Sequence, residues 1–283
     1  MAAWVGISGW NYPPWRGTFY PVGLPHRAEL AYAASQLDSI EINSSFYRLQ
    51  HPTSYHRWVA ETPADFCFAV KGARFITHLK RLTDAEQTVP NFLASGVLAL
   101  GRKLGPLLWQ LPPTFRFDVE RIRQFLLRLP RSTGEAAYLA RRHDERLAGR
   151  AWTGTADDRP LRHAMEVRHD SFKAQAFLEL LAENQVAAVI ADTAGKWPQF
   201  DVVTADFVYI RLHGAQELYV SGYTGPELAN WAGKISGWLD RGLDVYTYFD
   251  NDVKVRAPYD AMALARLLAG RPTAALPVSD YRA

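Results

Sequence analysis

Short apolar runs separated by polar stretches recur along the whole chain. Each run has the length of a β-strand and ends in polar residues. Between them, apolar residues recur at helical spacing, most clearly over 118–129, where Val119, Ile122 and Phe125 share one face. The runs predict eight strands, at 5–8, 40–43, 66–71, 107–111, 164–168, 188–192, 207–213 and 245–249. The spacing predicts helices over 28–37, 83–100, 118–129, 174–184, 226–239 and 259–268.

This alternation of strands and helices predicts an α/β fold with a mostly parallel sheet. Eight such units in 283 residues predict a single (β/α)8 TIM-type barrel domain over 1–283, with an open doubly wound sheet as the alternative. Residues 131–160, rich in Arg, Asp, Thr and Gly, predict an insertion after the fourth strand. Thr83 and Glu86 have capping-box spacing, and Pro226 suits a first helical turn.

The composition is that of an ordinary globular protein, except for a high content of aromatic residues. Aromatic residues make up 13% of the chain, which suits an aromatic-walled cleft. The net charge is only +3, too small to indicate a nucleic-acid or membrane partner. The single cysteine, Cys67, excludes an intramolecular disulfide and is expected to be a buried thiol. Without a leader-like start or a long apolar span, we expect a cytoplasmic protein.

Polar side chains occupy inward-facing positions near the strand ends. Ile40 and Ile42 share one face of their strand, so Glu41 and Asn43 share the other. In a barrel one face meets the surrounding helices and the other faces inward, and functional residues gather at the carboxyl ends of the strands. The same parity predicts a ring of polar residues at one mouth: Ser8, Glu41, Asn43, Lys71, Gln110, Glu166, Arg168, Asp192, Arg211 and His213.

The charges of this ring balance. The ring contains three acidic residues, Glu41, Glu166 and Asp192, and three basic residues, Lys71, Arg168 and Arg211. A self-satisfied ion-pair network is therefore one interpretation. Because desolvating each ion costs several kcal/mol, a functional site is the favoured one. The loops after the first and seventh strands add Trp10 and Tyr223 to the same mouth, where they suit a flat group stacked between rings.

Several ordered motifs resemble one family. They include G-x-S-G-W at 6–10, E-x-N-x-S-F-Y-R at 41–48, Tyr209-x-Arg211-x-His213-Gly214 and Tyr248-Phe249-x-Asn251. The collection is similar to the YecE-like family, domain of unknown function 72, over about residues 5–268. The resemblance implies a TIM-type barrel and adds Tyr47, His78 and Asn251 to the candidate substrate-binding residues. It supplies no activity, although a loose likeness of some members to barrel endonucleases has been proposed.

The candidate chemistry follows from the ring. Gly6-Ile7-Ser8-Gly9-Trp10 lacks the spacing of a serine-hydrolase elbow, and Gly195-Lys196 lacks that of a phosphate loop. We therefore favour a hydrolase or lyase that uses metal-free acid/base chemistry on an anionic or phosphate-containing small molecule. Glu41, Glu166, His213 and Asp192 are the candidate catalytic residues; Ser8, Trp10, Asn43, Tyr47, Lys71, His78, Gln110, Arg168, Arg211, Tyr223 and Asn251 are the candidate substrate-binding residues.

Two alternatives remain. A metal-dependent phosphodiesterase would use the same acids with a divalent ion, although Lys71, Arg168 and Arg211 would repel it. A non-catalytic mouth could instead stack single-stranded nucleic acid, helped by Arg16, Arg48, Arg74 and Lys80. For the favoured mechanism, Glu41→Gln and Arg211→Ala are expected to abolish turnover and to leave the fold intact.

Overall fold

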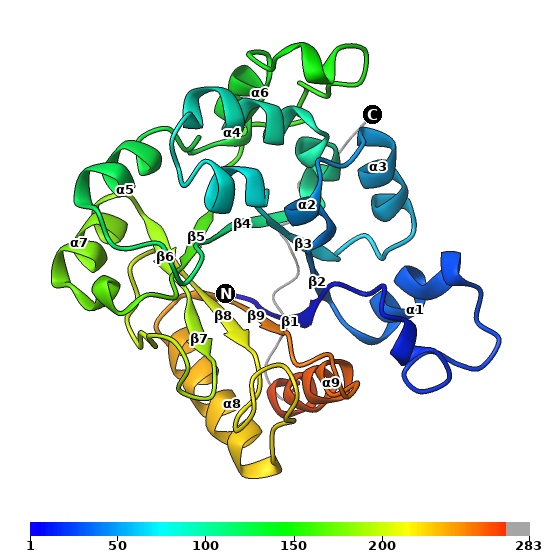
Figure 1. Cartoon of the computed structure of the whole chain (residues 1–283). Coiled ribbons are helices and arrows are strands. Elements are labelled where there is room, and N and C mark those ends of the chain that lie inside the picture. Colours follow the sequence, from blue (N-terminus) through cyan, green and yellow to red (C-terminus); the bar gives the residue numbers. More distant parts are fainter. Residues whose placement is uncertain (270–283) are drawn as a thin grey trace.

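Parallel strands curl into a barrel with helices around its outside (Figure 1). The structure, a computed structural model, describes residues 1–269. Within them the sheet has nine strands in the order β6-β5-β4-β3-β2-β1-β9-β8-β7. The strands are β1 (Ala3–Ser8), β2 (Ser39–Ile42), β3 (Cys67–Lys71), β4 (Leu104–Gln110), β5 (His163–Glu166), β6 (Val186–Ala188), β7 (Ile190–Asp192), β8 (Phe207–Leu212) and β9 (Asp244–Phe249).

The barrel closes at Val189. This residue alone separates β6 from β7, so the sixth predicted strand is present as two short pieces. The first piece pairs with β5 and the second with β8. The Val189 amide donates a 3.0 Å hydrogen bond to the Met165 carbonyl of β5. The predicted α/β TIM-type barrel is therefore confirmed.

Most predicted helices are present. The structure contains α1 (Glu29–Gln36), α2 (Ser44–Tyr47), α3 (Pro52–Ala60), α4 (Ala85–Ala94), α5 (Val119–Leu126), α6 (Thr133–Ala140), α7 (Gln175–Glu183), α8 (Gly225–Asp240) and α9 (Ala257–Leu268). The predicted helix over 83–100 is shorter, because Gly96 takes a φ of +118° and a 3₁₀ segment, η4 (Val97–Lys103), follows. The sequence did not predict α2 and α3.

Of the two predicted helix starts, one is correct. The predicted capping box at Thr83 and Glu86 is wrong: α4 begins after Asp84, and the Thr83 hydroxyl donates instead to the Lys80 carbonyl at 2.5 Å. A capping box forms at Thr224 and Glu227, and Pro226 lies in the first turn of α8 as predicted.

The insertion over 131–160 contains α6 and a short 3₁₀ turn, η5 (Glu145–Leu147), and it follows α5 after the fourth strand. It is fixed to α4 by a reciprocal pair of hydrogen bonds. Asn91 Nδ2 donates to Asp144 Oδ2 at 2.9 Å, and the Asp144 amide donates to Asn91 Oδ1 at 2.9 Å. The insertion thus extends the helical layer on one side of the barrel.

The core has two compartments. The larger lies between the sheet and the helices, and the smaller fills the barrel, where Tyr209 and Tyr248 pack with small residues such as Ala69 and Ala164. Cys67 belongs to the inner compartment and is buried as expected. Towards the carboxyl ends of the strands, the same inward positions become polar. No helix within residues 1–269 is long and apolar enough to cross a membrane.

Candidate active site

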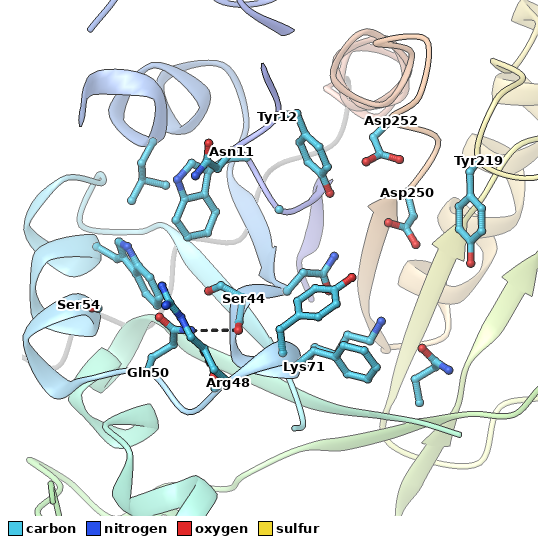
Figure 2. A pocket seen from close by; sticks show the side chains of 18 of the residues that line it. Asn11, Tyr12, Ser44, Arg48, Gln50, Ser54, Lys71, Tyr219, Asp250 and Asp252 are labelled. Carbon is cyan, nitrogen blue, oxygen red and sulfur yellow. Dashed lines mark hydrogen bonds between the residues drawn. The ribbon is translucent and has the colours of Figure 1, made fainter. Parts of the chain in front are cut away.

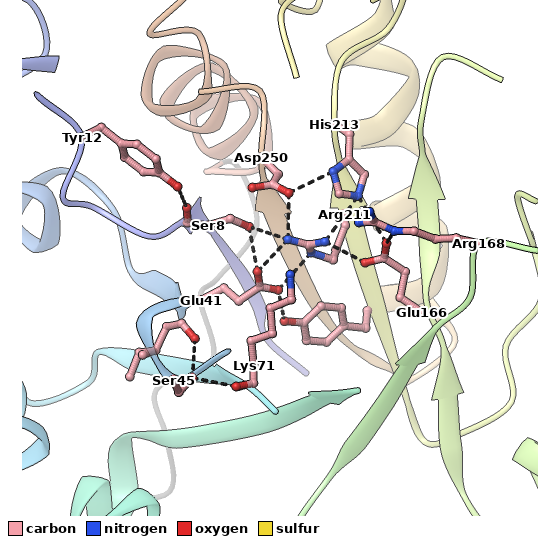
Figure 3. A network of polar contacts seen from close by, with 12 residues as sticks. Ser8, Tyr12, Glu41, Ser45, Lys71, Glu166, Arg168, Arg211, His213 and Asp250 are labelled. Atoms are coloured by element: carbon pink, nitrogen blue, oxygen red, sulfur yellow. Dashed lines mark hydrogen bonds and ion pairs between the residues drawn. The ribbon is translucent and has the colours of Figure 1, made fainter. Parts of the chain in front are cut away.

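A fully buried arginine stands at the centre of the polar ring. Arg211, on β8, has 0% of its surface exposed and contacts three carboxylates (Figure 3). Its Nε and Nη2 donate to Glu41 at 3.1 and 2.9 Å. Its Nη1 donates to Glu166 at 2.7 Å, and its Nη2 also donates to Asp250 at 2.9 Å. The parity rule therefore correctly brought Glu41, Glu166 and Arg211 together.

The carboxylates of Glu41 and Glu166 accept further hydrogen bonds from other side chains. Glu41 accepts hydrogen bonds from the Ser8 hydroxyl at 2.9 Å and from the Tyr209 hydroxyl at 2.6 Å. Glu166 accepts from Arg168 Nε at 2.7 Å. Burial alone would raise the pKa of Glu166, but Arg168 and Arg211 hold that pKa well below its usual range. Glu166 is thus an ionised partner of the arginines at neutral pH.

His213 belongs to the same network in its neutral form. Its Nδ1 lies 3.0 Å from Asp250 Oδ2, and the ring is fully buried. Burial, with help from the nearby Arg211 charge, lowers the pKa of His213. Asp250 shows the opposite balance: burial opposes its charge, but Arg211 and His213 lower its pKa to about 2.

These contacts change the role expected for several predicted catalytic residues. Glu41, Glu166, Arg211 and His213 are all buried, and none of them lines the pocket. Removing Arg211 would leave buried carboxylates without their counter-charge, which is strongly destabilising. The expectation that Arg211→Ala leaves the fold intact is therefore revised.

The cavity (Figure 2) adjoins this network, because Asp250, which pairs with Arg211, and Arg168, which pairs with Glu166, both line it. Its volume is about 950 Å³, which is ample for a small molecule. Predicted site residues that line it are Trp10, Asn43, Tyr47, Lys71, His78, Gln110 and Arg168. The aromatic loops expected over this mouth also contribute Tyr12 and Tyr219, and the lining further includes Gln50, Trp58, Asp250 and Asp252.

Lys71 reaches this pocket from the last position of β3. Its residue surface is 8% exposed, and its Nζ lies 4.4 Å from the centroid of the Phe46 ring. Within residues 1–269, no carboxylate oxygen lies within 4 Å of this Nζ. Burial and the neighbouring Arg211 lower the pKa of Lys71 to about 8, although Glu41 and Asp250 oppose the shift. The side chain is therefore an amine close to its titration point at neutral pH.

His78 faces the same pocket as a neutral imidazole. Its Nδ1 lies 2.9 Å from the Thr77 hydroxyl. Burial, and then the charge of Lys71, lower the pKa of His78 to about 4. It can donate or accept a hydrogen bond there without adding charge.

An acid on the opposite wall titrates near neutrality (Figure 2). Burial and the neighbouring Asp250 raise the pKa of Asp252 to about 6. Its other neighbour is Tyr12, whose hydroxyl donates to the Ser8 carbonyl at 2.6 Å. The pocket therefore contains two groups, Lys71 and Asp252, whose pKa values lie on either side of neutral pH.

Three predicted site residues lie elsewhere. Asp192 shares the parity of Ile190, which packs in the outer compartment, whereas Ala191 faces inward; its assignment to the ring is therefore wrong. Tyr223 accepts a 3.1 Å hydrogen bond from the Gly214 amide. Asn251 donates to the Ser221 carbonyl at 2.9 Å and to Asp260 at 2.8 Å. None of the three lines the pocket, and the last two brace the loop after β8.

Two of the four basic residues considered for nucleic-acid stacking are paired with acids. Arg16 pairs with Glu29 at 2.6 Å, and Lys80 pairs with Asp84 at 2.6 Å. Arg48 lines the pocket and also, together with Arg74, a smaller one beside it. Two of the four charges are thus neutralised locally.

The acids of the network also fit a divalent metal poorly. Within the described part of the chain, no group of three or more His, Cys, Asp or Glu side chains is arranged to hold an ion. The carboxylates of Glu41, Glu166 and Asp250 converge on Arg211 instead. A metal at that point would have to displace a guanidinium that satisfies all three.

Comparison with protein families gives one match over almost the entire chain. The family described as "Protein of unknown function DUF72" matches residues 4–280. The protein YunF of Bacillus subtilis is 28% identical over 124 residues, which are 42% of this chain and 43% of YunF. YecE of Escherichia coli K12 is 29% identical over 112 residues, which are 40% of this chain and 38% of YecE. The matched segment thus spans about two fifths of these relatives.

Solved structures show the same fold. A DUF72 family protein from Thermotoga maritima superposes with a TM-score of 0.75 at 24% identity, covering 95% of this chain and 100% of that one. One from Enterococcus faecalis gives 0.71 at 20% identity, covering 94% and 95%. A D-psicose 3-epimerase from Clostridium cellulolyticum gives 0.53 at 12% identity, covering 95% and 99%. At these identities the likeness concerns the fold alone.

Proposed function

The chain belongs to the DUF72 family, and we propose that its pocket is the active site of an enzyme acting on a small anionic molecule. The reaction uses acid/base chemistry by side chains, without a metal ion, and the substrate carries a phosphate or carboxylate group. A hydrolase or a lyase fits this chemistry. The acids and bases involved differ from those that the sequence pattern suggested.

The observation that carries the proposal is the position of Lys71. A buried ammonium is normally paired with a carboxylate, because desolvation otherwise costs several kcal/mol. Here Glu41, Glu166 and Asp250 form ion pairs with Arg211. Lys71 faces the cavity, with the Phe46 ring beside its ammonium. An unpaired cation that points into a pocket is suited to an anionic ligand or to proton transfer.

Arg168 supports the anionic substrate class. Its Nε is bound to Glu166, and its guanidinium lies 3.9 Å from the centroid of the Trp197 ring. Its contacts with Glu166 and Trp197 fix the position of the guanidinium before a ligand binds. Arg168 also lines the pocket, as Lys71 does. Its remaining N–H groups suit a phosphate or carboxylate oxygen.

Lys71 and Asp252 would divide the proton transfers. With a pKa of about 8, Lys71 is mostly protonated at pH 7, yet it loses its proton easily. With a pKa of about 6, Asp252 is mostly ionised there and can accept a proton. Two titratable groups whose environments shift them towards neutrality are typical of acid/base catalysis.

The test is a turnover screen with phosphorylated and carboxylated small molecules in the presence of EDTA. We expect wild-type turnover to survive the chelator and Lys71→Met to lower kcat/KM by at least about 100-fold, the lower range for losing a positioned acid or base. Lys173→Met is the matched control, because Lys173 is exposed and pairs with Asp170 on the surface. Turnover that requires an added divalent ion, or that persists in Lys71→Met, would contradict the proposal.

A further inference from the structure

The ammonium of Lys71 is placed as a nucleophile would be. The side chain rises from the end of β3 towards the Arg211 network (Figure 3), and the residue also lines the cavity. A lysine locked in a salt bridge cannot attack a substrate without breaking the pair. In the described part of the chain, Lys71 has no such pair.

The surroundings of Lys71 also favour the neutral amine. The Phe46 ring lies against the ammonium, and the buried guanidinium of Arg211 is close enough for its charge to lower the pKa of Lys71. Desolvation and a neighbouring cation are the two arrangements that activate lysine for attack on carbonyl carbon. With the pKa lowered to about 8, roughly a tenth of the side chain is unprotonated at pH 7.

We propose that Lys71 forms an imine with the carbonyl carbon of a small anionic aldehyde or ketone bound in this pocket. This inference rests on the proposed function and narrows its substrate class to oxo acids and oxo phosphates. The neutral Nζ attacks the carbonyl carbon, a C–N bond forms, and one proton passes from the attacking nitrogen to the former carbonyl oxygen to give a neutral carbinolamine. Loss of the hydroxyl as water then leaves the C=N bond, so one carbonyl and one amine give one imine and one water.

The pocket supplies an acid for the loss of the hydroxyl. The leaving hydroxyl needs a proton, and a carboxyl with a pKa of about 6, that of Asp252, can carry one to it. The anionic group of the substrate would lie against Arg168, on the same lining. Because imine formation neutralises no buried carboxylate, the Arg211 network can remain unchanged during the reaction.

The experiment is reductive trapping on the full-length protein. Glyoxylate, pyruvate and pyridoxal 5′-phosphate are each incubated with wild-type protein and sodium cyanoborohydride, and adducts are located by peptide mass spectrometry. We expect a stoichiometric adduct on Lys71 with at least one probe, competed by inorganic phosphate, and more than tenfold less modification at the surface residue Lys173. Lys71→Arg, which keeps the charge, and Lys71→Met should both lose the adduct, whereas Lys173→Met should keep it.

The possible outcomes separate this inference from the proposed function. Modification that follows surface exposure and spares Lys71 would overturn the imine. If Lys71 is not trapped, but wild-type protein turns over an anionic substrate and Lys71→Met does not, the proposed function stands without the covalent step. If Lys71 is neither trapped nor needed for turnover, both fail.

Discussion

Arg211→Met is expected to lower the free energy of unfolding by at least about 3–5 kcal/mol, the usual cost of removing one partner from a buried ion pair. The reason is the concentration of charge around this residue. Glu41 and Glu166 are almost completely buried; the guanidinium donates two hydrogen bonds to Glu41 and one to Glu166. Urea denaturation followed by circular dichroism measures the loss, and the deficit should shrink at acid pH, where protonated carboxyls need no counter-charge.

Arg123→Met is the matched control for this change. Arg123 lies on the surface of α5, 3.8 Å from Glu183, with both side chains well exposed. Exposed pairs contribute about 0–1 kcal/mol, so its loss should be small. A stability change in Arg211→Met as small as that of the control would show that the network does not hold the barrel mouth together.

Lys71→Met is expected to have the opposite sign and to stabilise the protein at pH 7 by roughly 2 kcal/mol. Lowering the pKa of Lys71 from 10.5 to about 8 corresponds to a cost of about 3 kcal/mol for holding the charged form in the folded state. Methionine has a similar length and no charge, and it gives up only the ammonium contact with Phe46, about 0.5–1 kcal/mol. Denaturant titration gives the difference from wild type directly.

The pH dependence of this difference has a defined direction. As pH rises above about 8, the folded state gives up the Lys71 proton before the unfolded state does, so wild-type stability rises until about pH 10.5. The advantage of Lys71→Met should therefore be full below pH 8 and fade above it. Lys173→Met should show neither effect, and a destabilised Lys71→Met would mean that the ammonium is structurally satisfied.

The sequence was enough to predict the barrel and the centre of the ring. Alternation along a strand is a strict geometric rule, so Glu41 on β2 and Arg211 on β8 could be assigned to one interior without any knowledge of their distance. The same rule cannot tell which polar residues reach the cavity and which lie beneath it. That division depends on side-chain length and on the loops above the strands. It leaves Glu41 and His213 buried beneath the cavity and makes Lys71 the candidate acid/base residue.

Two errors came from the ends of strands. Asp192 was assigned inward, but the inward residues of that strand are Val189 and Ala191, so the parity was off by one. Asp250 was overlooked because it follows the last residue of β9, although it continues the inward series of Tyr246 and Tyr248. Extending each strand by one residue would have found it. The pKa of Asp252, by contrast, depends on tertiary burial that no local pattern contains.

The central claim is that Lys71 is an unpaired amine close to its titration point at the floor of the pocket. Its pKa is lowered by burial and by Arg211 on β8, and Glu41, Asp250 and Glu166 around that guanidinium oppose the shift. An NMR titration of protein with ¹³Cε-labelled lysine, assigned with Lys71→Arg, measures this pKa directly. The account predicts a midpoint of about 8 for Lys71, and a midpoint at the ordinary value of 10.5 would contradict it.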